Sequence, residues 1–199
     1  MRSDVIHVTN EGSGIGKALA EVELVASYKA LPQKQALHLR LLTEEMMGMM
    51  RALTGEREAD FWIDDEDGTF RLHLEVQTIM NAEMRKKLLS ASSKGENTAA
   101  KGVMGKIRDL FERFLEPSDS QFSSAYLAGL TYTGADFHEM SSEPLWMWSF
   151  NQYKSYVMES GAKNEAWDEL EKSIVARLAD EVKIGVTSRN VEMVIYKKY

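Results

Sequence analysis

The chain has 199 residues, a net charge of −7 and no cysteine, and 44% of its residues are hydrophobic while 28% are charged. This length and composition are typical of one globular domain with a sizeable core. The negative charge argues against a nucleic-acid or anionic-membrane partner, and the absence of cysteine excludes disulfides, thiolate nucleophiles and thiolate metal sites.

The sequence predicts neither a signal peptide nor a membrane helix. Residues 1–4 lead into a short apolar stretch with polar breaks, which lacks the apolar core and the cleavage site of a signal peptide. No apolar run approaches the roughly 18 residues that a membrane helix needs. We therefore expect a cytoplasmic protein that binds neither membranes nor nucleic acids.

The N-terminal quarter predicts one strand followed by two helices. Residues 5–8 read as a short strand, which ends at the glycine-containing turn 10–14. Apolar residues then recur at helical spacing over residues 16–31 and again over residues 33–53. Pro32 separates the two predicted helices, because proline ends one helix and is tolerated in the first turn of the next.

Residues 59–64 and 69–76 predict a hairpin with a turn at residues 65–68, where Gly68 accepts a positive φ at little cost. In the second strand apolar and polar residues alternate, which predicts one buried and one wet face. The polar positions of that strand are Arg71, His73 and Glu75.

Beyond residue 80 the sequence predicts helices at 81–90 and 98–115 and an irregular stretch at 116–142. Two further helices follow at 145–158 and 165–179, and the strands 181–186 and 191–196 form a closing hairpin. Hairpins outnumber strand–helix–strand units in this order. We therefore expect an α/β protein of the α+β kind, a two-layer sandwich. Its mixed, mostly antiparallel sheet should have about five strands, with helices on one face and a helical elaboration.

The stretch Val8-Thr9-Asn10-Glu11-Gly12-Ser13-Gly14-Ile15-Gly16-Lys17 resembles the start of a short-chain dehydrogenase, where a glycine-rich turn and a helix N-terminus receive the cofactor phosphates. A dinucleotide-binding unit needs a second strand soon after the first helix, whereas residues 17–53 predict two consecutive helices. The catalytic Tyr-x-x-x-Lys of that family is also missing. The context favours a plain strand-to-helix turn.

The stretch Leu39-Arg40-Leu41-Leu42-Thr43-Glu44-Glu45-Met46-Met47-Gly48-Met49-Met50 resembles the first nucleotide-binding helix of the histidine-kinase-like ATPases. It is most similar to that of the bacterial anti-sigma-factor serine kinases. In that family the helix carries Glu-x-x-x-Asn, with the glutamate as a base and the asparagine on Mg²⁺. The resemblance assigns the catalytic role to Glu45, while Met49 stands where the asparagine belongs.

The same family continues with a hairpin, an adenine-binding Asp-x-Gly-x-Gly loop, a glycine-rich lid and a closing hairpin. The adenine position falls near Gln77, where no glycine follows at residues 78–80. The stretch Lys101-Gly102-Val103-Met104-Gly105-Lys106 resembles the lid. The resemblance implies that Lys101, Gly102, Gly105 and Lys106 face the phosphates of ATP, with Mg²⁺ as the accompanying ion. It also implies a single ATPase-type domain over residues 1–199, with 116–180 as an elaboration.

Three functions stay open. The missing motif residues favour a regulatory protein of ATPase-like fold that has a degenerate nucleotide site and acts through protein contacts. An active anti-sigma-type ATPase or serine kinase that uses Glu45 is the second possibility. The third is a pure interaction module whose aromatic helix, residues 145–158, forms the interface. A closing hairpin that joins the first hairpin in one sheet would favour the first two. No protein metal site is predicted, since the four histidines lack ligand spacing.

Overall fold

The computed structural model describes residues 1–51, 57–77, 146–159, 173–186 and 190–199. Within them six strands form one sheet in the order β1-β2-β3-β6-β5-β4, and each neighbouring pair is antiparallel. The strands are β1 (Ile6–Thr9), β2 (Glu58–Glu66), β3 (Thr69–Gln77), β4 (Trp146–Ser149), β5 (Glu181–Val186) and β6 (Asn190–Lys198). The helices are α1 (Ile15–Tyr28), α2 (Gln33–Arg51), α6 (Phe150–Glu159) and α8 (Ile174–Leu178).

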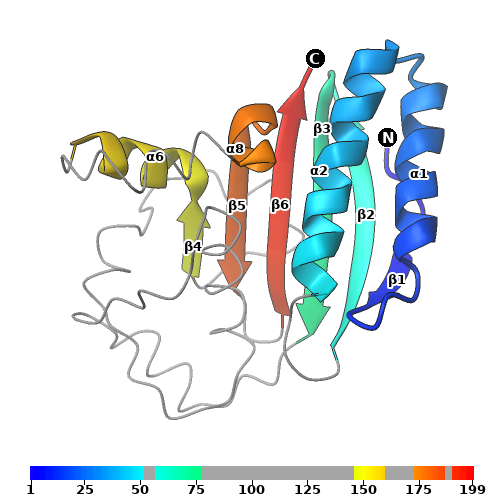
Figure 1. Ribbon diagram of the computed structural model, residues 1–199, viewed down its shortest axis with the longest axis horizontal. Helices are drawn as coiled ribbons and strands as arrows, with labels where there is room; N and C mark the ends of the chain where they lie inside the picture. The colour runs from blue at the N-terminus through cyan, green and yellow to red at the C-terminus, as the bar shows by residue number, and fades with distance from the viewer. Residues whose placement is uncertain (52–56, 78–145, 160–172, 187–189) are drawn as a thin grey trace.

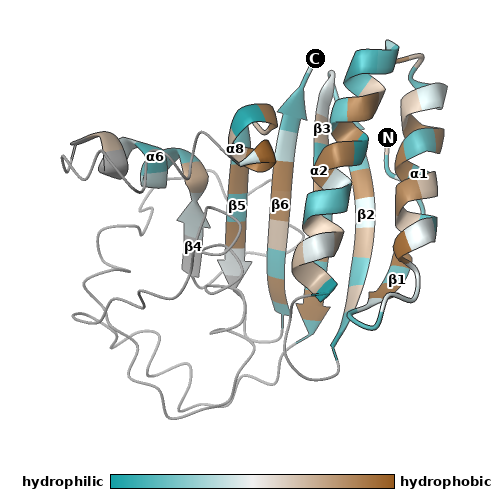
Figure 2. Ribbon diagram, in the orientation of Figure 1, coloured by the Kyte–Doolittle hydropathy of each residue, from teal (hydrophilic) through white to brown (hydrophobic). Residues whose placement is uncertain are grey.

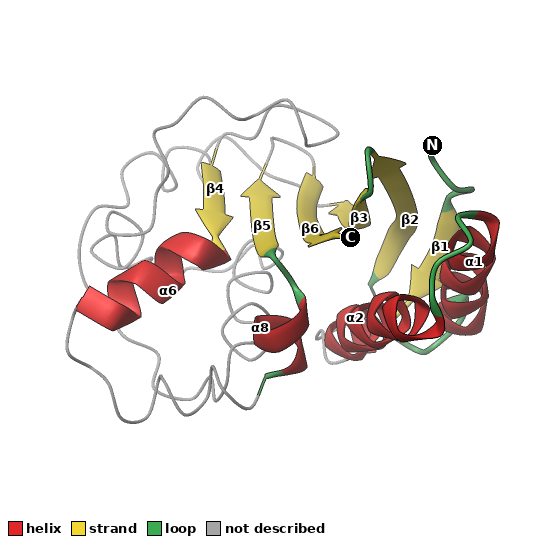
Figure 3. Cartoon of the chain, turned by 90° about the horizontal axis from the view of Figure 1, so that it is seen from above, coloured by secondary structure: helices red, strands yellow, loops and turns green. Residues whose placement is uncertain are grey.

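The helices lie on one face of the sheet, so the described part of the chain is a two-layer α+β sandwich (Figures 1 and 3). This confirms the predicted fold class, with six strands in place of about five. Because β1 and β2 are antiparallel and both α1 and α2 lie between them in the chain, residues 1–77 do not form a dinucleotide-binding strand–helix–strand unit.

The core lies between the sheet and the helices. The alternating apolar residues of β3 that the sequence predicted to be buried are at most 2% exposed, and the cross-strand neighbours of Leu72 and Leu74, which are Ile63, Phe61, Ile195 and Met193, are fully buried. The middle of β6 is hydrophobic and its C-terminal end hydrophilic (Figure 2). Four methionines of α2 are buried in the same core, at Met46, Met47, Met49 and Met50. Each buried side chain of this size contributes about 1.5–3 kcal/mol.

Gly14 makes the turn between β1 and α1 possible. Its φ is +78°, and a Cβ atom there would lie 2.0 Å from the carbonyl oxygen of His7. Glycine is the residue that combines a left-handed backbone with so close an approach. The glycine-rich stretch therefore has a structural role in letting the chain reverse directly into α1.

The first hairpin turns at Asp67 and Gly68, whose φ angles are +50° and +78°. Two central residues with positive φ, of the sequence Asp-Gly, form the turn type that best matches the twist of paired strands. β2 consequently continues through Asp65 and Glu66. The four-residue turn predicted at residues 65–68 is wrong, because the acidic residues Asp65 and Glu66 still pair with β3.

The helix predicted over residues 145–158 is also wrong in its first part. Trp146–Ser149 forms β4 and pairs with β5, and the helix α6 starts only at Phe150. The hydroxyl of Ser149 accepts a hydrogen bond from Gln152 N at 3.4 Å, as an N-cap side chain does. Glu181 of β5 accepts a second one from Asn151 N at 3.1 Å. The partner strand therefore decides where α6 begins.

Residues 146–159 and 173–179 fall in the segment 116–180 that was expected to be an elaboration, and β4 is a strand of the main sheet. Of the helix predicted over residues 165–179, the structure describes α8. The helices predicted at 81–90 and 98–115 and the irregular stretch 116–142 lie outside the described residues.

Candidate functional site

Glu45 lies on α2 and is partly exposed at the edge of the helix–sheet core. Burial and the neighbouring charge of Glu44 raise the pKa of the Glu45 carboxyl above its ordinary value. Among the described residues none forms a hydrogen bond or ion pair with it. A raised pKa makes a carboxylate a better base, so Glu45 has the electrostatics of the role that the resemblance assigns to it.

Met49 follows Glu45 by one helical turn and is 4% exposed. Its thioether packs in the core and offers no oxygen ligand, whereas Mg²⁺ requires oxygen. The described part of α2 thus has a carboxylate at the position to which the resemblance assigns the base, and no oxygen ligand one turn later.

Gln77 ends β3 and is exposed. It lines a cavity of about 330 Å³ at the start of β2 and the end of β3, together with His7, Arg57, Asp60 and Glu75 among others. Val76 points into the core, so Gln77 projects from the opposite face of the sheet, away from α2. The structure does not bring Gln77 and Glu45 together. Lys101, Gly102, Gly105 and Lys106 lie outside the described residues.

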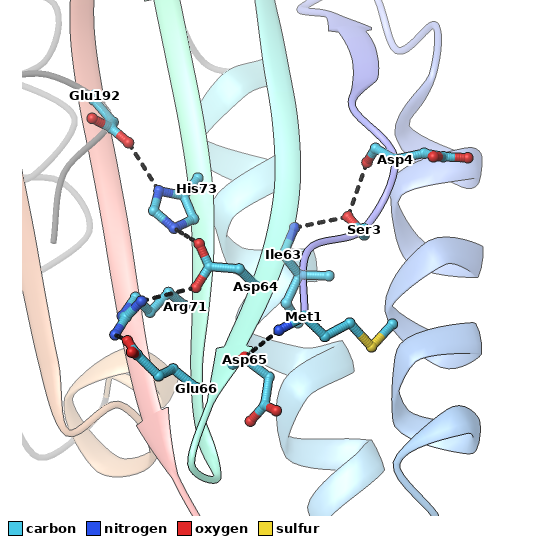
Figure 4. Close-up of polar contacts among 10 residues, drawn as sticks. All are labelled: Met1, Ser3, Asp4, Ile63, Asp64, Asp65, Glu66, Arg71, His73 and Glu192. Atoms are coloured by element: carbon cyan, nitrogen blue, oxygen red, sulfur yellow. Dashed lines mark hydrogen bonds and ion pairs between the residues drawn. The ribbon is translucent and has the colours of Figure 1, made fainter.

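A second group of polar residues lies on the sheet face opposite the helices, and sequence reasoning missed it as a unit (Figure 4). At its centre is His73 of β3, which is 2% exposed. Its Nδ1 lies 2.8 Å from Glu192 Oε1 on β6, and its Nε2 lies 3.0 Å from Asp64 Oδ2 on β2. The imidazole therefore bridges carboxylates from the strands on both sides of it. We call these three residues the histidine bridge.

The histidine bridge continues into an ion-pair network. Asp64 Oδ1 also lies 3.2 Å from Arg71 Nη1, and Arg71 Nη2 lies 2.5 Å from Glu66 Oε2. Charged groups therefore alternate in sign from Glu66 to Asp64. This alternation offsets part of the cost of holding them away from water.

Two aromatic contacts border the histidine bridge. The ring of His73 stacks on the indole of Trp62, with centroids 4.7 Å apart and planes 10° apart. The guanidinium of Arg2 lies 4.5 Å from the same indole, and Arg2 pairs with Asp64 as a β-bridge. The electron-rich face of an indole favours cations, so Trp62 stabilises a charged imidazole.

Burial opposes the charged form of His73, but its contacts with Asp64 and Glu192 outweigh burial and raise its pKa. For Asp64 the balance is the same: burial acts to raise the pKa of its carboxyl, while His73 and Arg71 lower it overall. Each partner thus favours the ionised form of the other. The contacts of the bridge therefore favour the protonated form of His73.

His7 offers a comparison within the same sheet. Its Nδ1 lies 3.2 Å from Asp60 Oδ1 and its Nε2 3.6 Å from Glu58 Oε2, but its side chain is 58% exposed. It therefore has the same types of partner as His73 without the burial. Water screens such pairs, and exposed ion pairs contribute about 0–1 kcal/mol.

Neither histidine arrangement forms a metal centre, since the described residues contain no group of three or more ligands that could hold a metal ion. Nδ1 of His73 is hydrogen-bonded to Glu192, and Nε2 lies 3.0 Å from Asp64 Oδ2 in an ion pair that lacks hydrogen-bond geometry. The only signal in the sequence was a histidine on the wet side of an alternating strand. Its partner Glu192 is 119 residues away.

The aromatic segment predicted as an interface helix is largely core. Trp148, Phe150 and Tyr153 are at most 4% exposed, and Trp148 packs its ring against the other two. Side chains buried in this way are not available to a partner. These three side chains therefore do not support an interface at residues 145–158, and the interaction module stays a prediction.

None of the helices within the described ranges is long and apolar enough to span a membrane. No protein-family model, no curated protein and no solved structure matches the chain.

Proposed function

We propose that the chain is a regulatory protein of histidine-kinase-like ATPase fold whose nucleotide site is degenerate and which acts through protein contacts. The main support is the sheet topology. The closing strands β5 and β6 join the first hairpin in one sheet through the pairing of β3 with β6. That arrangement fits an ATPase-like sandwich better than a chain with a separate C-terminal helical unit.

The degeneracy rests on α2. Glu45 is present with a raised pKa, but the position one turn later holds the buried Met49. Without an oxygen ligand at that position Mg²⁺ has no protein anchor there, and the triphosphate loses the ion that neutralises it. A protein of this kind transmits a signal by binding partners, because its fold does not carry the chemistry by itself.

The raised pKa of Glu45 favours a second candidate, an active anti-sigma-type ATPase or serine kinase. In that case the carboxylate accepts a proton from water or a substrate hydroxyl. Mg²⁺ would then be held by ATP and by residues other than Met49. The two candidates differ in one measurable property, which is Mg²⁺-dependent nucleotide binding.

The test is isothermal calorimetry with ATP and ADP, with and without Mg²⁺, on the natural chain and on Met49→Asn. We expect no Mg²⁺-dependent binding by the natural chain up to millimolar nucleotide. We expect Met49→Asn to gain it, because asparagine restores the oxygen ligand. The control is Met50→Asn, which replaces a neighbouring buried methionine that is not one turn from Glu45.

Micromolar Mg²⁺-dependent binding by the natural chain would overturn the degenerate site and support the active enzyme, and Glu45→Gln should then abolish turnover. A folded Met49→Asn that binds no better than Met50→Asn would count against the ATPase fold itself. Circular dichroism of both variants shows whether they are folded, which a polar residue in the core makes necessary.

A further inference from the structure

The two three-stranded halves of the sheet, β1-β2-β3 and β6-β5-β4, meet at one seam, where β3 runs antiparallel to β6 from the pair Thr69–Lys198 to the pair Gln77–Asn190. His73 lies in the middle of this seam, opposite Val194. Its ring reaches Glu192 on β6 and Asp64 on β2, so one side chain connects the three central strands. Figure 4 shows His73 between these two carboxylates.

We propose that His73 is a proton-operated clamp on the β3–β6 seam. With a proton on both ring nitrogens it binds Glu192 and Asp64 together, and on losing one proton it releases one of them. This makes the seam sensitive to pH independently of any nucleotide site.

The chemistry of the imidazole carries the proposal. The imidazolium has two N–H donors: Nδ1 is hydrogen-bonded to Glu192 Oε1 at 2.8 Å, and Nε2 faces Asp64 Oδ2 at 3.0 Å in an ion pair. Neutral imidazole keeps one donor and gains one lone pair, so one carboxylate then faces a lone pair at hydrogen-bond distance. Glu192 is 2% exposed, so water does not replace a contact that it loses with a charged His73. Removing one charged partner from a buried carboxylate is destabilising.

The charges around the ring favour the bound proton. The charged groups on the same sheet face within two positions of His73 along the strands are Asp60 and Asp64 of β2, Arg71 and Glu75 of β3, Glu192 of β6, and Glu181 and Lys183 of β5, with Glu66 two positions further along β2 and Arg2 beyond Trp62. Asp64 and Glu66 share the positive charge of Arg71 between them. Burial opposes the charged form of His73, but its contacts with Asp64 and Glu192 outweigh burial and raise the pKa of His73.

The direction of the pH effect follows from linkage. The folded chain holds the proton of His73 at a pH where the unfolded chain, with a pKa of about 6.5, has lost it. The stabilisation is fully present below about pH 6.5 and is lost as the pH rises through the folded pKa of His73. Over that interval the folding equilibrium constant should fall by up to about tenfold for each pH unit.

Two measurements on the full chain test the clamp. Proton–carbon NMR of the ring Cε1–H groups gives the titration of each histidine, assigned with His7→Gln and His73→Gln. Urea unfolding between pH 5.5 and 9 gives the folding equilibrium constant. We expect His73 to titrate above the unfolded value. We also expect His73→Gln to flatten the pH profile, because glutamine donates and accepts but does not titrate.

His7→Gln is the matched control, since His7 also lies beside two carboxylates but is exposed. We expect it to leave the pH profile unchanged. Glu192→Gln keeps the proposal testable if His73→Gln does not fold, because removal of one negative partner should lower the titration midpoint of His73. The clamp is refuted if His73 titrates at or below the unfolded value. It is also refuted if His73→Gln has the same pH profile as the natural chain.

Discussion

Gly14→Ala tests whether the glycine-rich turn exists for folding rather than for a phosphate. Gly14 has a φ of +78°, and the Cβ of alanine would lie 2.0 Å from His7 O and 3.1 Å from Val8 Cα. Real Cβ atoms essentially never approach another heavy atom within 3.0 Å. The obstacle is the main chain of β1, which cannot rotate away as a flexible side chain would.

Two costs add in this variant. A left-handed backbone costs a residue with a Cβ about 1–2 kcal/mol. Moving the main chain of β1 by roughly an ångström costs about another 1–3 kcal/mol, as overpacking does elsewhere. We expect Gly14→Ala to lower the free energy of unfolding by about 3 kcal/mol. For a chain of this length that corresponds to a fall in Tm of about 6–12 °C.

The assay is urea unfolding followed by far-UV circular dichroism, with Gly16→Ala as the control. Gly16 lies two residues further on, in the first turn of α1, and within the described residues no atom lies within 4 Å of its Cβ position. We expect Gly16→Ala to change the free energy of unfolding by less than about 0.5 kcal/mol, in the stabilising direction. A Gly14→Ala variant as stable as Gly16→Ala would refute the structural role of the turn.

Three further predictions concern other parts of the fold. Lys29→Met should cost about 2–3 kcal/mol of unfolding free energy in urea, because Asp65 is 6% exposed in its side chain and loses the ammonium that lies 2.5 Å away. Asp65→Asn should cost less, since Lys29 reaches water, and equal costs would contradict this explanation. Burial and the charge of Asp180 raise the pKa of Tyr199 to about 12. The contribution of Tyr199 to the free energy of unfolding should therefore be fully present below about pH 10 and be lost as the pH rises through 12. Tyr199→Phe should lack this alkaline loss in a pH series of Tm values. Gly48→Ala should raise the free energy of unfolding by about 0.5–1 kcal/mol in thermal unfolding, because Gly48 is exposed in α2 and within the described residues no atom lies within 4 Å of its Cβ position.

The fold class was predictable because its signals are local. The period of two in β3, the helical spacing in α1 and α2 and the Asp-Gly turn each act within a few residues. β4 was missed for the opposite reason. The stretch Trp146–Ser149 has four residues, and it is a strand because β5 lies beside it. A strand that short carries no period of its own to distinguish it from the first turn of a helix.

The candidate site divides in the same way. Glu45 could be proposed because it lies in a helix motif of five residues, and its role stays a prediction. That Gln77 points away from α2 could be expected once Val76 was taken as buried, since strand neighbours face opposite sides. The histidine bridge could not be found from local pattern. His73 stood on the side of β3 predicted to be wet, yet it is 2% exposed, and its partners come from β2 and from β6.

His7 and His73 show why residue type and neighbours alone do not define a site. Both stand on the polar side of a strand, and both have two carboxylates within 3.6 Å. The difference is solvent, since the His7 side chain is 58% exposed and that of His73 is 3% exposed. Water screens the first set of charges. Burial strengthens the interactions between His73 and its carboxylates and keeps these side chains away from water. Protonation of His73 then becomes coupled to the pairing of β3 with β6. The pH-sensitive clamp that we propose for this face therefore depends on the pairing of β6 with β3.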